Sequence, residues 1–521
     1  MIRKAIDMPE ATAALTPRQI ITAMSGLVIA MLLAMLDNMI VSPALPTIVG
    51  DLGGLDHLSW VVTGYILAST VATPIWGKLG DLFGHKATFM SSITIFLIGS
   101  ALCGMSQDML QLILFRAIQG LGAGGLMVGI MSVIGLMVSP RERGKYQGIM
   151  MAVMPAAMIG GPLIGGFITD NLSWRWVFYV NLPLGLLSLV VVWATLTLPG
   201  EVTKKAAQLS IDWLGASVLS VWITALVLTV TWGGSQYAWG SWQIIGLAVV
   251  AIAGFALFLI VERRAAEPII PLQLFSNRNF SVASALGFVV GFAMFGGVTF
   301  LPQFQQFVQG QSATNSGLLL MPMMISAMVV SLAGGLLITK TGRYKAIPIV
   351  GAAMLVVGLW LFSTMDANTS VAQTGLYMVA LGVGMGCLMQ TTNLIAQNSV
   401  PIRDMGTATG TATFARNMGG SIGVALLGAI YANQLTSSLG DTGGQGTPSA
   451  SGMTPAALHQ LPEAVQIVFK QAVVNGTHAI FLWGAVIAAA AFVLAWLIKE
   501  VPLRETLTPD DVAEPADSIG H

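Results

Sequence analysis

Long apolar segments recur along almost the whole chain, which has 521 residues. A helix needs about 20 mostly apolar residues to cross the hydrocarbon core of a bilayer, so each such segment is a candidate membrane span. Only 9% of the residues are charged, compared with about a quarter in ordinary soluble domains. The sequence therefore excludes a soluble protein and predicts an all-α polytopic membrane protein. The fourteen candidate spans are residues 20–42, 59–76, 87–106, 110–137, 145–169, 176–197, 213–232, 243–261, 280–302, 314–339, 346–364, 373–397, 407–432 and 476–498.

Basic residues are distributed unevenly between the segments that connect these spans. If the N-terminus lies inside, 19 of the 23 lysines and arginines fall on the inner side and only Arg175 and Lys470 on the outer side. Cytoplasmic loops of membrane proteins carry such an excess of basic residues. The pattern predicts an even number of spans with both termini cytoplasmic. We expect the membrane to be the inner (plasma) membrane of a bacterial cell.

Two short patterns occur twice. The sequence at 77–86 is echoed at 335–345, and the sequence at 141–148 is echoed at 403–410, at offsets of 258 and 262 residues. Two similar halves around a central site are the construction of many secondary transporters. In the loop before the last span, a helical pattern at 454–474 predicts a short interfacial helix. The predicted domains are an N-terminal six-helix bundle (1–199), two extra linker helices with cytoplasmic loops (200–279), a C-terminal six-helix bundle (280–498) with a long outer loop (433–475), and a cytoplasmic tail (499–521).

Three charged residues lie within candidate spans. Asp37 is the only carboxylate well inside one, and an acid in hydrocarbon normally faces a cavity or a partner. Arg116 lies at a similar depth and is its natural partner. The two residues are candidates for proton coupling, although a permanent ion pair that only joins two helices would look the same in the sequence. Arg416 is a candidate polar site in the second half.

The segment between the second and third spans, GKLGDLFGHK at 77–86, combines glycines with charges. Its glycines allow a tight turn, and Asp81 can accept hydrogen bonds from helix N-terminal amides or from a nearby arginine. One interpretation is a solvated basic loop. The other is a gate latch, whose charge contacts hold one conformation and break in another. The predicted latch residues are Gly77, Asp81, Gly84, Lys86 and Arg141.

The fifth span is rich in small residues and contains a proline, which removes a backbone hydrogen bond and favours a kink. It can serve as a bending helix, or its small residues can simply allow close packing. The residues concerned are Gly148, Gly161, Pro162, Gly165 and Gly166.

Methionines and glutamines supply candidates for a substrate-lining surface. Methionine side chains adapt to varied apolar ligands, and the chain has 29 of them. Helix packing explains methionine stripes equally well, and glutamines near a span end can lie at the interface. The candidates are Met31, Met35, Met154, Met158, Gln305 and Gln309.

Other classes of function find little support in the sequence. Two cysteines and five scattered histidines give no disulfide framework and no metal-binding pattern. A net charge of zero argues against nucleic-acid binding. A membrane-embedded enzyme would need a nucleophile with a base, or paired acids, and none is evident. We therefore expect neither cofactor nor metal. Separately, we expect a chain that works as a monomer in the bilayer, on protons and a small-molecule substrate.

Several of these segments resemble motifs of a known family. The segment at 77–86 resembles motif A of the major facilitator superfamily, and LFRAIQGLG at 114–122 resembles its motif B. The small residues of the fifth span resemble motif C, the antiporter signature, except that Ala157 stands where that motif has a glycine. LDNMIV at 36–41 resembles the first-span motif of the fourteen-helix drug:proton antiporters, with Met39 in place of the usual Thr. The stretch at 174–183 is similar to one typical of that branch.

The resemblance implies a fold of two six-helix bundles plus two inserted helices, and a proton-driven multidrug exporter that works by alternating access. It implies proton coupling at Asp37 and Arg116, a conformational latch at Asp81, and a bending helix at Gly161 and Pro162. The substrates would be amphipathic or hydrophobic small molecules, often cationic. A dedicated exporter of one host metabolite or lipid on the same fold is the alternative.

Overall fold

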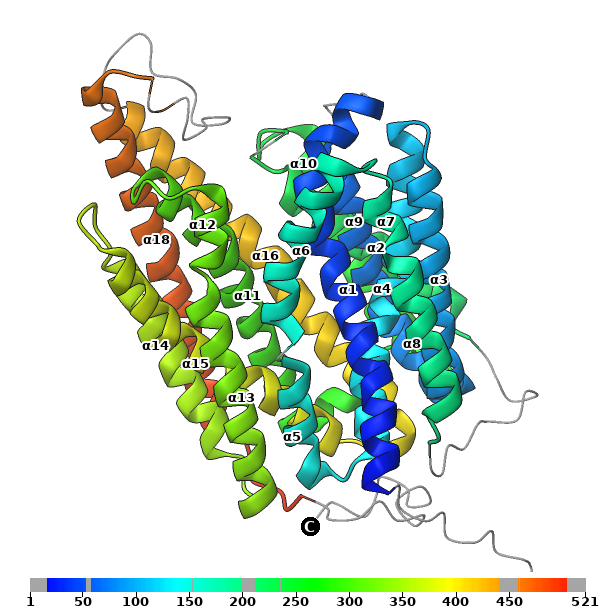
Figure 1. The fold of residues 1–521 in the computed structure, drawn as a ribbon. Coiled ribbons are helices and arrows are strands. Elements are labelled where there is room, and N and C mark those ends of the chain that lie inside the picture. Colours follow the sequence, from blue (N-terminus) through cyan, green and yellow to red (C-terminus); the bar gives the residue numbers. More distant parts are fainter. Residues whose placement is uncertain are drawn as a thin grey trace, which may run out of the picture.

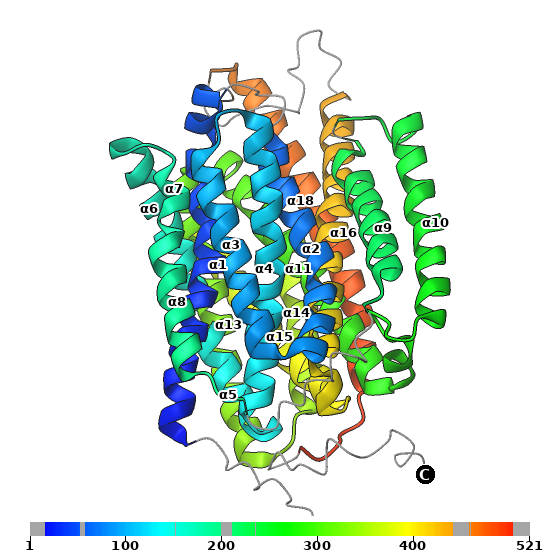
Figure 2. The ribbon, with the colours of Figure 1, turned by 90° about the vertical axis from the view of Figure 1, so that its right-hand side faces the viewer.

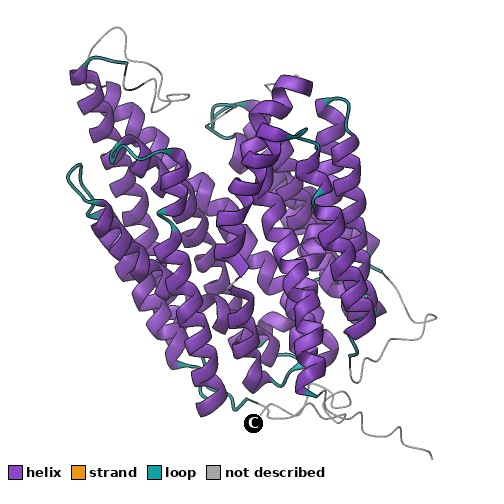
Figure 3. Cartoon of the chain, viewed as in Figure 1, coloured by secondary structure: helices purple, strands orange, loops and turns teal. Residues whose placement is uncertain are grey.

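The protein is almost entirely helical in this computed structural model, which describes residues 16–52, 58–151, 153–198, 211–234, 236–440, 458 and 460–503. Within these ranges there is no β-strand, only an isolated bridge between Gly233 and Tyr237 (Figure 3). The helices of the N-terminal half are α1 (Pro17–Leu52), α2 (Leu58–Phe83), α3 (His85–Met105), α4 (Met109–Met137), α5 (Pro140–Met151), α6 (Val153–Asn171), α7 (Trp176–Tyr179) and α8 (Asn181–Thr195).

Two further helices precede the C-terminal half, namely α9 (Trp213–Trp232) and α10 (Trp242–Arg264). The C-terminal half then consists of the short helix η3 (Leu272–Ser276), α11 (Arg278–Phe307), α12 (Ala313–Leu318), α13 (Met321–Thr341), α14 (Ala346–Ser363), α15 (Val371–Asn398), the short helix η4 (Ile402–Asp404), α16 (Met405–Gly440) and α18 (Glu463–Trp496).

The two halves form separate helix groups that meet at one end. In Figure 1, α1–α4 and α8 lie in one group and α11, α13–α15 and α18 in the other. The groups lie together near the C-terminal end of the described chain and diverge toward the opposite end (Figure 1). We call the end where they meet the latch end, because it carries Asp81 and Arg141. There α2 packs against α16 and α5 against α13.

Small residues make the approach of the halves possible. A Cβ on Gly77 would collide with the Gly406 carbonyl oxygen, and one on Gly335 with the Gly144 backbone. Helix axes in a bilayer come this close only where side chains are absent or small. The glycine pairs Gly77–Gly406 and Gly144–Gly335 therefore define the two lines along which the halves meet.

The two inserted helices lie beside the seam between the halves (Figure 2). Leu219 and Trp222 of α9 belong to one apolar cluster with Val71 of α2 and with Phe414 and Met418 of α16. Because this cluster includes residues from both halves, α9 packs across the seam, and α10 packs against α9 on its outer side (Figure 2).

Twelve helices in the described part of the chain are long and apolar enough to cross a membrane. The predicted spans at 59–76 and 407–432 lie in α2 and α16, helices of 26 and 36 residues that are not among those twelve. Both lie at the seam, where they pack against each other. The count of fourteen spans and the sides on which the termini lie remain predictions.

The predicted bounds of the outer loop, 433–475, need a correction. Helix α16 continues to Gly440, and α18 begins at Glu463 and runs unbroken to Trp496, so there is no separate interfacial helix over the described part of 454–474. Helix α18 begins directly after Pro462, a residue that is tolerated at a helix start, and its Gly476 packs against Tyr431 of α16. Residues 441–457 and most of the predicted tail 499–521 lie outside the described residues.

The topology predicts which surface cysteines a membrane-impermeant maleimide labels in intact cells. Asn368→Cys, at the exposed turn after α14, should be labelled, and Thr341→Cys, at the exposed end of α13, should react only after the cells are opened. The parent chain is the control, because its cysteines Cys103 and Cys387 are both buried. Labelling of Thr341→Cys in intact cells would contradict the orientation.

Candidate functional site

A buried ion pair lies in the interior of the N-terminal half. Arg116 Nη1 on α4 donates to Asp37 Oδ2 on α1 at 2.7 Å. Asp37 is 0% exposed and Arg116 is 1% exposed. The structure thus brings together the two residues that the sequence pairs by depth. Their role in proton coupling remains a prediction.

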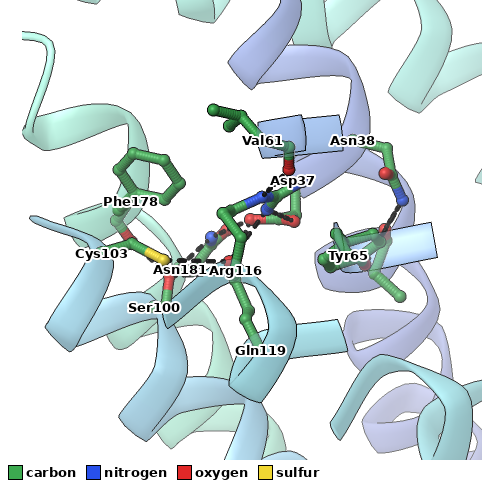
Figure 4. A network of polar contacts seen from close by, with 11 residues as sticks. Asp37, Asn38, Val61, Tyr65, Ser100, Cys103, Arg116, Gln119, Phe178 and Asn181 are labelled. Atoms are coloured by element: carbon green, nitrogen blue, oxygen red, sulfur yellow. Dashed lines mark hydrogen bonds and ion pairs between the residues drawn. The ribbon is translucent and has the colours of Figure 1, made fainter. Parts of the chain in front are cut away.

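Neutral polar side chains complete the surroundings of Asp37 (Figure 4). Gln119 Nε2 and Asn181 Nδ2 donate to Asp37 Oδ1 at 2.7 and 2.8 Å. The same two amide groups donate to the Ser100 hydroxyl oxygen at 3.1 and 3.0 Å. Both carboxylate oxygens therefore accept hydrogen bonds, which is the pattern that an ionised carboxylate requires when it is buried.

The Arg116 guanidinium is held on several sides. Its Nη1 also donates to Gln119 Oε1 at 2.8 Å, and its Nε donates to the Val61 carbonyl oxygen at 3.4 Å. Its central carbon lies 4.1 Å from the centre of the Tyr65 ring, within the range of a cation–π contact. The site joins side chains of α1, α3, α4 and α8 to the backbone and aromatic ring of α2.

A glycine allows α3 and α4 to approach closely enough to build this network. A Cβ on Gly99 would lie 2.5 Å from the backbone nitrogen of Gln119. Its absence lets the next residue, Ser100, reach the amide groups of Gln119 and Asn181. Gln119 and Asn181 lie in the segments 114–122 and 174–183, but no role for them was predicted from the sequence. The available signal was that each is a polar side chain within an apolar span, and a buried polar side chain needs a partner.

The latch end holds a second set of contacts, and these join the two halves. Asp81 on α2 accepts hydrogen bonds from the backbone N–H groups of Gly406 at 2.7 Å and Thr407 at 2.6 Å, and from the Thr407 hydroxyl at 2.6 Å. These donors belong to the first turn of α16. A carboxylate there satisfies orphan amides and complements the positive end of the helix dipole. The sequence left two partners open for Asp81, helix N-terminal amides or an arginine, and in the structure its contacts across the seam are with the amides.

Arg141 makes the complementary contact at the other seam. Its Nε donates to the Thr339 carbonyl oxygen at 2.7 Å, and Nη2 donates to the Lys340 carbonyl oxygen at 3.1 Å. Both carbonyls belong to the last turn of α13, where free acceptors and the negative end of the dipole favour a cation. An acid and a base of the N-terminal half thus each cap a helix end of the C-terminal half.

The other predicted latch residues differ in what they do. Gly84 has a φ of 95°, so the turn between α2 and α3 requires glycine. Gly77 allows the close approach of α2 to α16. Lys86 is a correction, because its Nζ donates to the Trp193 carbonyl oxygen at 2.8 Å, within its own half. Lys86 is close to Asp81 in the sequence, but it belongs to α3, whereas Asp81 belongs to α2.

The predicted bending helix consists of α5 and α6. Gly161 packs against Met39, and Gly165 packs against the backbone of Ile40, so α6 lies directly on α1 just after Asp37. Gly148 of α5 contacts the backbone of α13 in the other half. Helix α6 continues through Pro162, and nothing lies within 4 Å of the position that a Cβ on Gly166 would occupy.

The candidate substrate-lining residues separate into two groups. Met154 and Met158 of the N-terminal half pack against the core of the C-terminal half and so lie between the halves. Met31 is buried in the core of its own half, with Met35 packed against it. Gln305 is 0% exposed. Gln309 ties α11 to α15, because its Nε2 donates to Thr374 Oγ1 at 2.9 Å.

No cluster of three or more metal-binding side chains occurs among the residues that the structure describes.

Outside the spans, the pKa of the Asp404 carboxyl, just before α16, is raised. The larger cause is burial, and the second is the negative charge of Asp81.

Comparison with known proteins identifies the family. The model of the Major Facilitator Superfamily matches residues 27–424, and the chain belongs to this superfamily. The chain is 37% identical over 516 residues to the multidrug transporter protein MdtP of Bacillus subtilis, covering 93% of this chain and 94% of that one. It is 41% identical over 497 residues to the MFS-type transporter Rv1877 of Mycobacterium tuberculosis, covering 95% of this chain and 71% of that one. The solved proton:xylose symporter XylE has the same fold, with a TM-score of 0.57 at 14% identity over 92% of this chain and 96% of that one.

Replacement of Arg116 tests how far the network stabilises the fold. Arg116→Met leaves the Asp37 carboxylate buried without its cation, and we expect the free energy of unfolding to fall by about 3–5 kcal/mol. The double variant Asp37→Asn with Arg116→Met should recover part of this loss, because no unpaired charge remains. Thermal unfolding in detergent measures both. Losses that simply add would contradict the coupling of the two side chains.

Removal of the Asp81 charge should weaken the latch. In Asp81→Asn the end of α16 loses a charge-assisted contact worth about 1.5–3 kcal/mol, so the two halves should separate at the latch end. Spin labels at the exposed positions Ser91 of α3 and Thr341 of α13 report this separation as a longer distance. The control is Asp404→Asn, since Asp404 pairs with Arg403 of its own half at 3.6 Å. The same lengthening in both variants would contradict the assignment.

Proposed function

We propose that this transporter is a proton-coupled multidrug efflux antiporter of the fourteen-helix drug:proton antiporter branch. It exports amphipathic or hydrophobic small molecules, cations among them, by alternating access. The observation that carries the proposal is the buried Asp37–Arg116 pair, a titratable carboxyl in a membrane-spanning bundle. The similarity to a multidrug transporter over almost the full chain supports the choice of substrate.

The charge of Asp37 is the variable in the proposed cycle. The conformation described here has a closed latch end, so the substrate path opens at the opposite, outer end. A proton that enters from there neutralises Asp37 and weakens its attraction to Arg116. The latch then opens, the proton leaves to the inside, and the ionised site favours the binding of the next substrate molecule.

The packing of α1 offers a mechanical route from Asp37 to the latch. Met39 and Ile40 follow Asp37 by two and three residues and lie against Gly161 and Gly165 of α6. Helix α6 follows α5 in the chain, and α5 carries the contacts to α13. A displacement of α1 on protonation of Asp37 therefore acts directly on one of the two seams.

We further propose that the chain acts as a monomer in the inner (plasma) membrane, with both termini cytoplasmic. Both sides of each seam come from the same chain, so alternating access needs no partner subunit. The latch end is then cytoplasmic, as the distribution of lysine and arginine predicts.

Transport in proteoliposomes tests the proton-coupling role. With Asp37→Asn, we expect export of N-phenylnaphthylamine and ethidium driven by a pH gradient to fall about tenfold or more, because the coupling free energy between proton and substrate is lost. Exchange of labelled for unlabelled dye without a gradient should persist, since it needs no change in protonation.

The matched control is Asp170→Asn, an exposed acid at the end of α6, which should transport as the parent does. Gradient-driven export that survives in Asp37→Asn would contradict the assignment. A parent protein that exports none of several unrelated dyes would instead indicate a dedicated exporter of one metabolite or lipid.

A further inference from the structure

Arg416 is a charged residue in the middle of α16 without a partner. Among the described residues, its side chain takes part in no hydrogen bond or ion pair, and no acidic group acts on it. It is only partly exposed. A cation at membrane depth is expensive unless an anion or a strong acceptor accompanies it. Arg116, by contrast, has Asp37, Gln119 and a backbone carbonyl as partners.

The packing of α16 shows which way Arg416 points. Phe414 and Met418 belong to the apolar cluster with α9 on one side of α16. Residues two positions apart on a helix lie on roughly opposite faces, so Arg416 projects away from α9. Residues three, four and seven positions apart share a face, and Thr409 and Thr413 therefore lie on the same face as Arg416.

The start of this face contacts the other half of the molecule, while its continuation at Gly419 and Gly423 packs against α11 of the same half. Gln397 Nε2 of α15 donates to Thr409 Oγ1 at 3.1 Å and to the Met131 carbonyl oxygen of α4 at 3.1 Å. The stripe is thus in contact with the N-terminal half at its latch-side end. Arg416 follows Thr409 by about two helical turns, and α16 runs from the latch end toward the end where the halves diverge (Figure 1).

A second unpartnered polar group lies beside Arg416. Thr413 is 2% exposed, and its hydroxyl has no hydrogen-bond partner in the described part of the chain. It lies three residues before Arg416, close enough for both side chains to contact the same functional group of a ligand. Buried hydroxyls normally find a partner. Two neighbouring donors without acceptors indicate that the acceptor is supplied from outside the chain.

We propose that Arg416 and Thr413 form a binding site for the oxyanion of amphipathic substrates, such as a carboxylate or a sulfonate. The planar guanidinium presents parallel N–H donors that match such a group, and the threonine hydroxyl adds a third donor. The apolar part of the molecule then contacts the surface between the halves, where Met154 and Met158 lie. This inference rests on the proposed export function and extends it to organic anions, which the sequence analysis did not anticipate.

Two dyes that share a scaffold and differ in charge provide the test. Anilinonaphthalene sulfonate carries an oxyanion, and N-phenylnaphthylamine is its neutral counterpart. We expect Arg416→Gln to weaken binding of the sulfonate to the purified full chain about 10- to 100-fold, the effect of losing a charge-assisted hydrogen bond. Binding of the neutral dye should change less than about twofold, which also verifies that the variant is folded.

Three further variants define the role of the site. Arg416→Lys should retain part of the affinity for the sulfonate, because the charge remains while the fork geometry is lost. Thr413→Val should weaken sulfonate binding about 3- to 10-fold, as expected for one uncharged hydrogen bond. Arg343→Gln is the matched control, since Arg343 is an exposed arginine of the same half, and it should bind both dyes as the parent does.

Equal affinity for the sulfonate in the parent and in Arg416→Gln would overturn the proposal. A similar loss for both dyes would also overturn it, because it would assign Arg416 a structural role. The proposed export function is decided separately, by proton-driven export of the neutral dye. If that export occurs while sulfonate binding does not depend on Arg416, only the proposal of the oxyanion site is wrong.

Discussion

A charged side chain inside a membrane bundle must find compensating charge or hydrogen bonds within the protein, and the N-terminal half is built around this requirement. Asp37 and Arg116 neutralise each other at 2.7 Å, and amide groups of Gln119 and Asn181 satisfy the remaining carboxylate oxygen. Such a network depends on all of its members, because a buried polar group that loses its partner is costly. Proton uptake by Asp37 would remove the attraction that holds α1 to α4, so the same interaction that stabilises the bundle can drive its rearrangement.

At the latch end, charged side chains pair with the backbone groups of helix ends instead of with other charged side chains. Asp81 caps the start of α16, and Arg141 caps the end of α13, so the two seams carry charges of opposite sign. Contacts of this type form only when the helix end is in place and are lost as a unit when it moves. A latch built from such contacts would hold one conformation and release it as a unit, which is what alternating access between two halves requires.

Charges and their spacing made parts of this arrangement predictable. The depth of Asp37 and Arg116 in their spans made them natural partners, and helix amides were one of the two partners that the sequence left open for Asp81. The hydrogen-bond shell of Ser100, Gln119 and Asn181 was not predicted, because neutral polar residues are common in spans and only the fold brings these three together. The place of Lys86 depends on the path of the α2–α3 turn. The continuation of α18 through Gly476 was not predicted, because a helical pattern before a span does not show whether the two form one helix.

Proton release on substrate binding tests the central claim most directly. If substrate and proton compete through Asp37, addition of N-phenylnaphthylamine to the purified protein in weakly buffered detergent solution should release up to about one proton per dye molecule bound. Asp37→Asn should bind the dye and release none. Release of the same number of protons by Asp37→Asn would contradict the account, because the coupling carboxyl would then lie elsewhere.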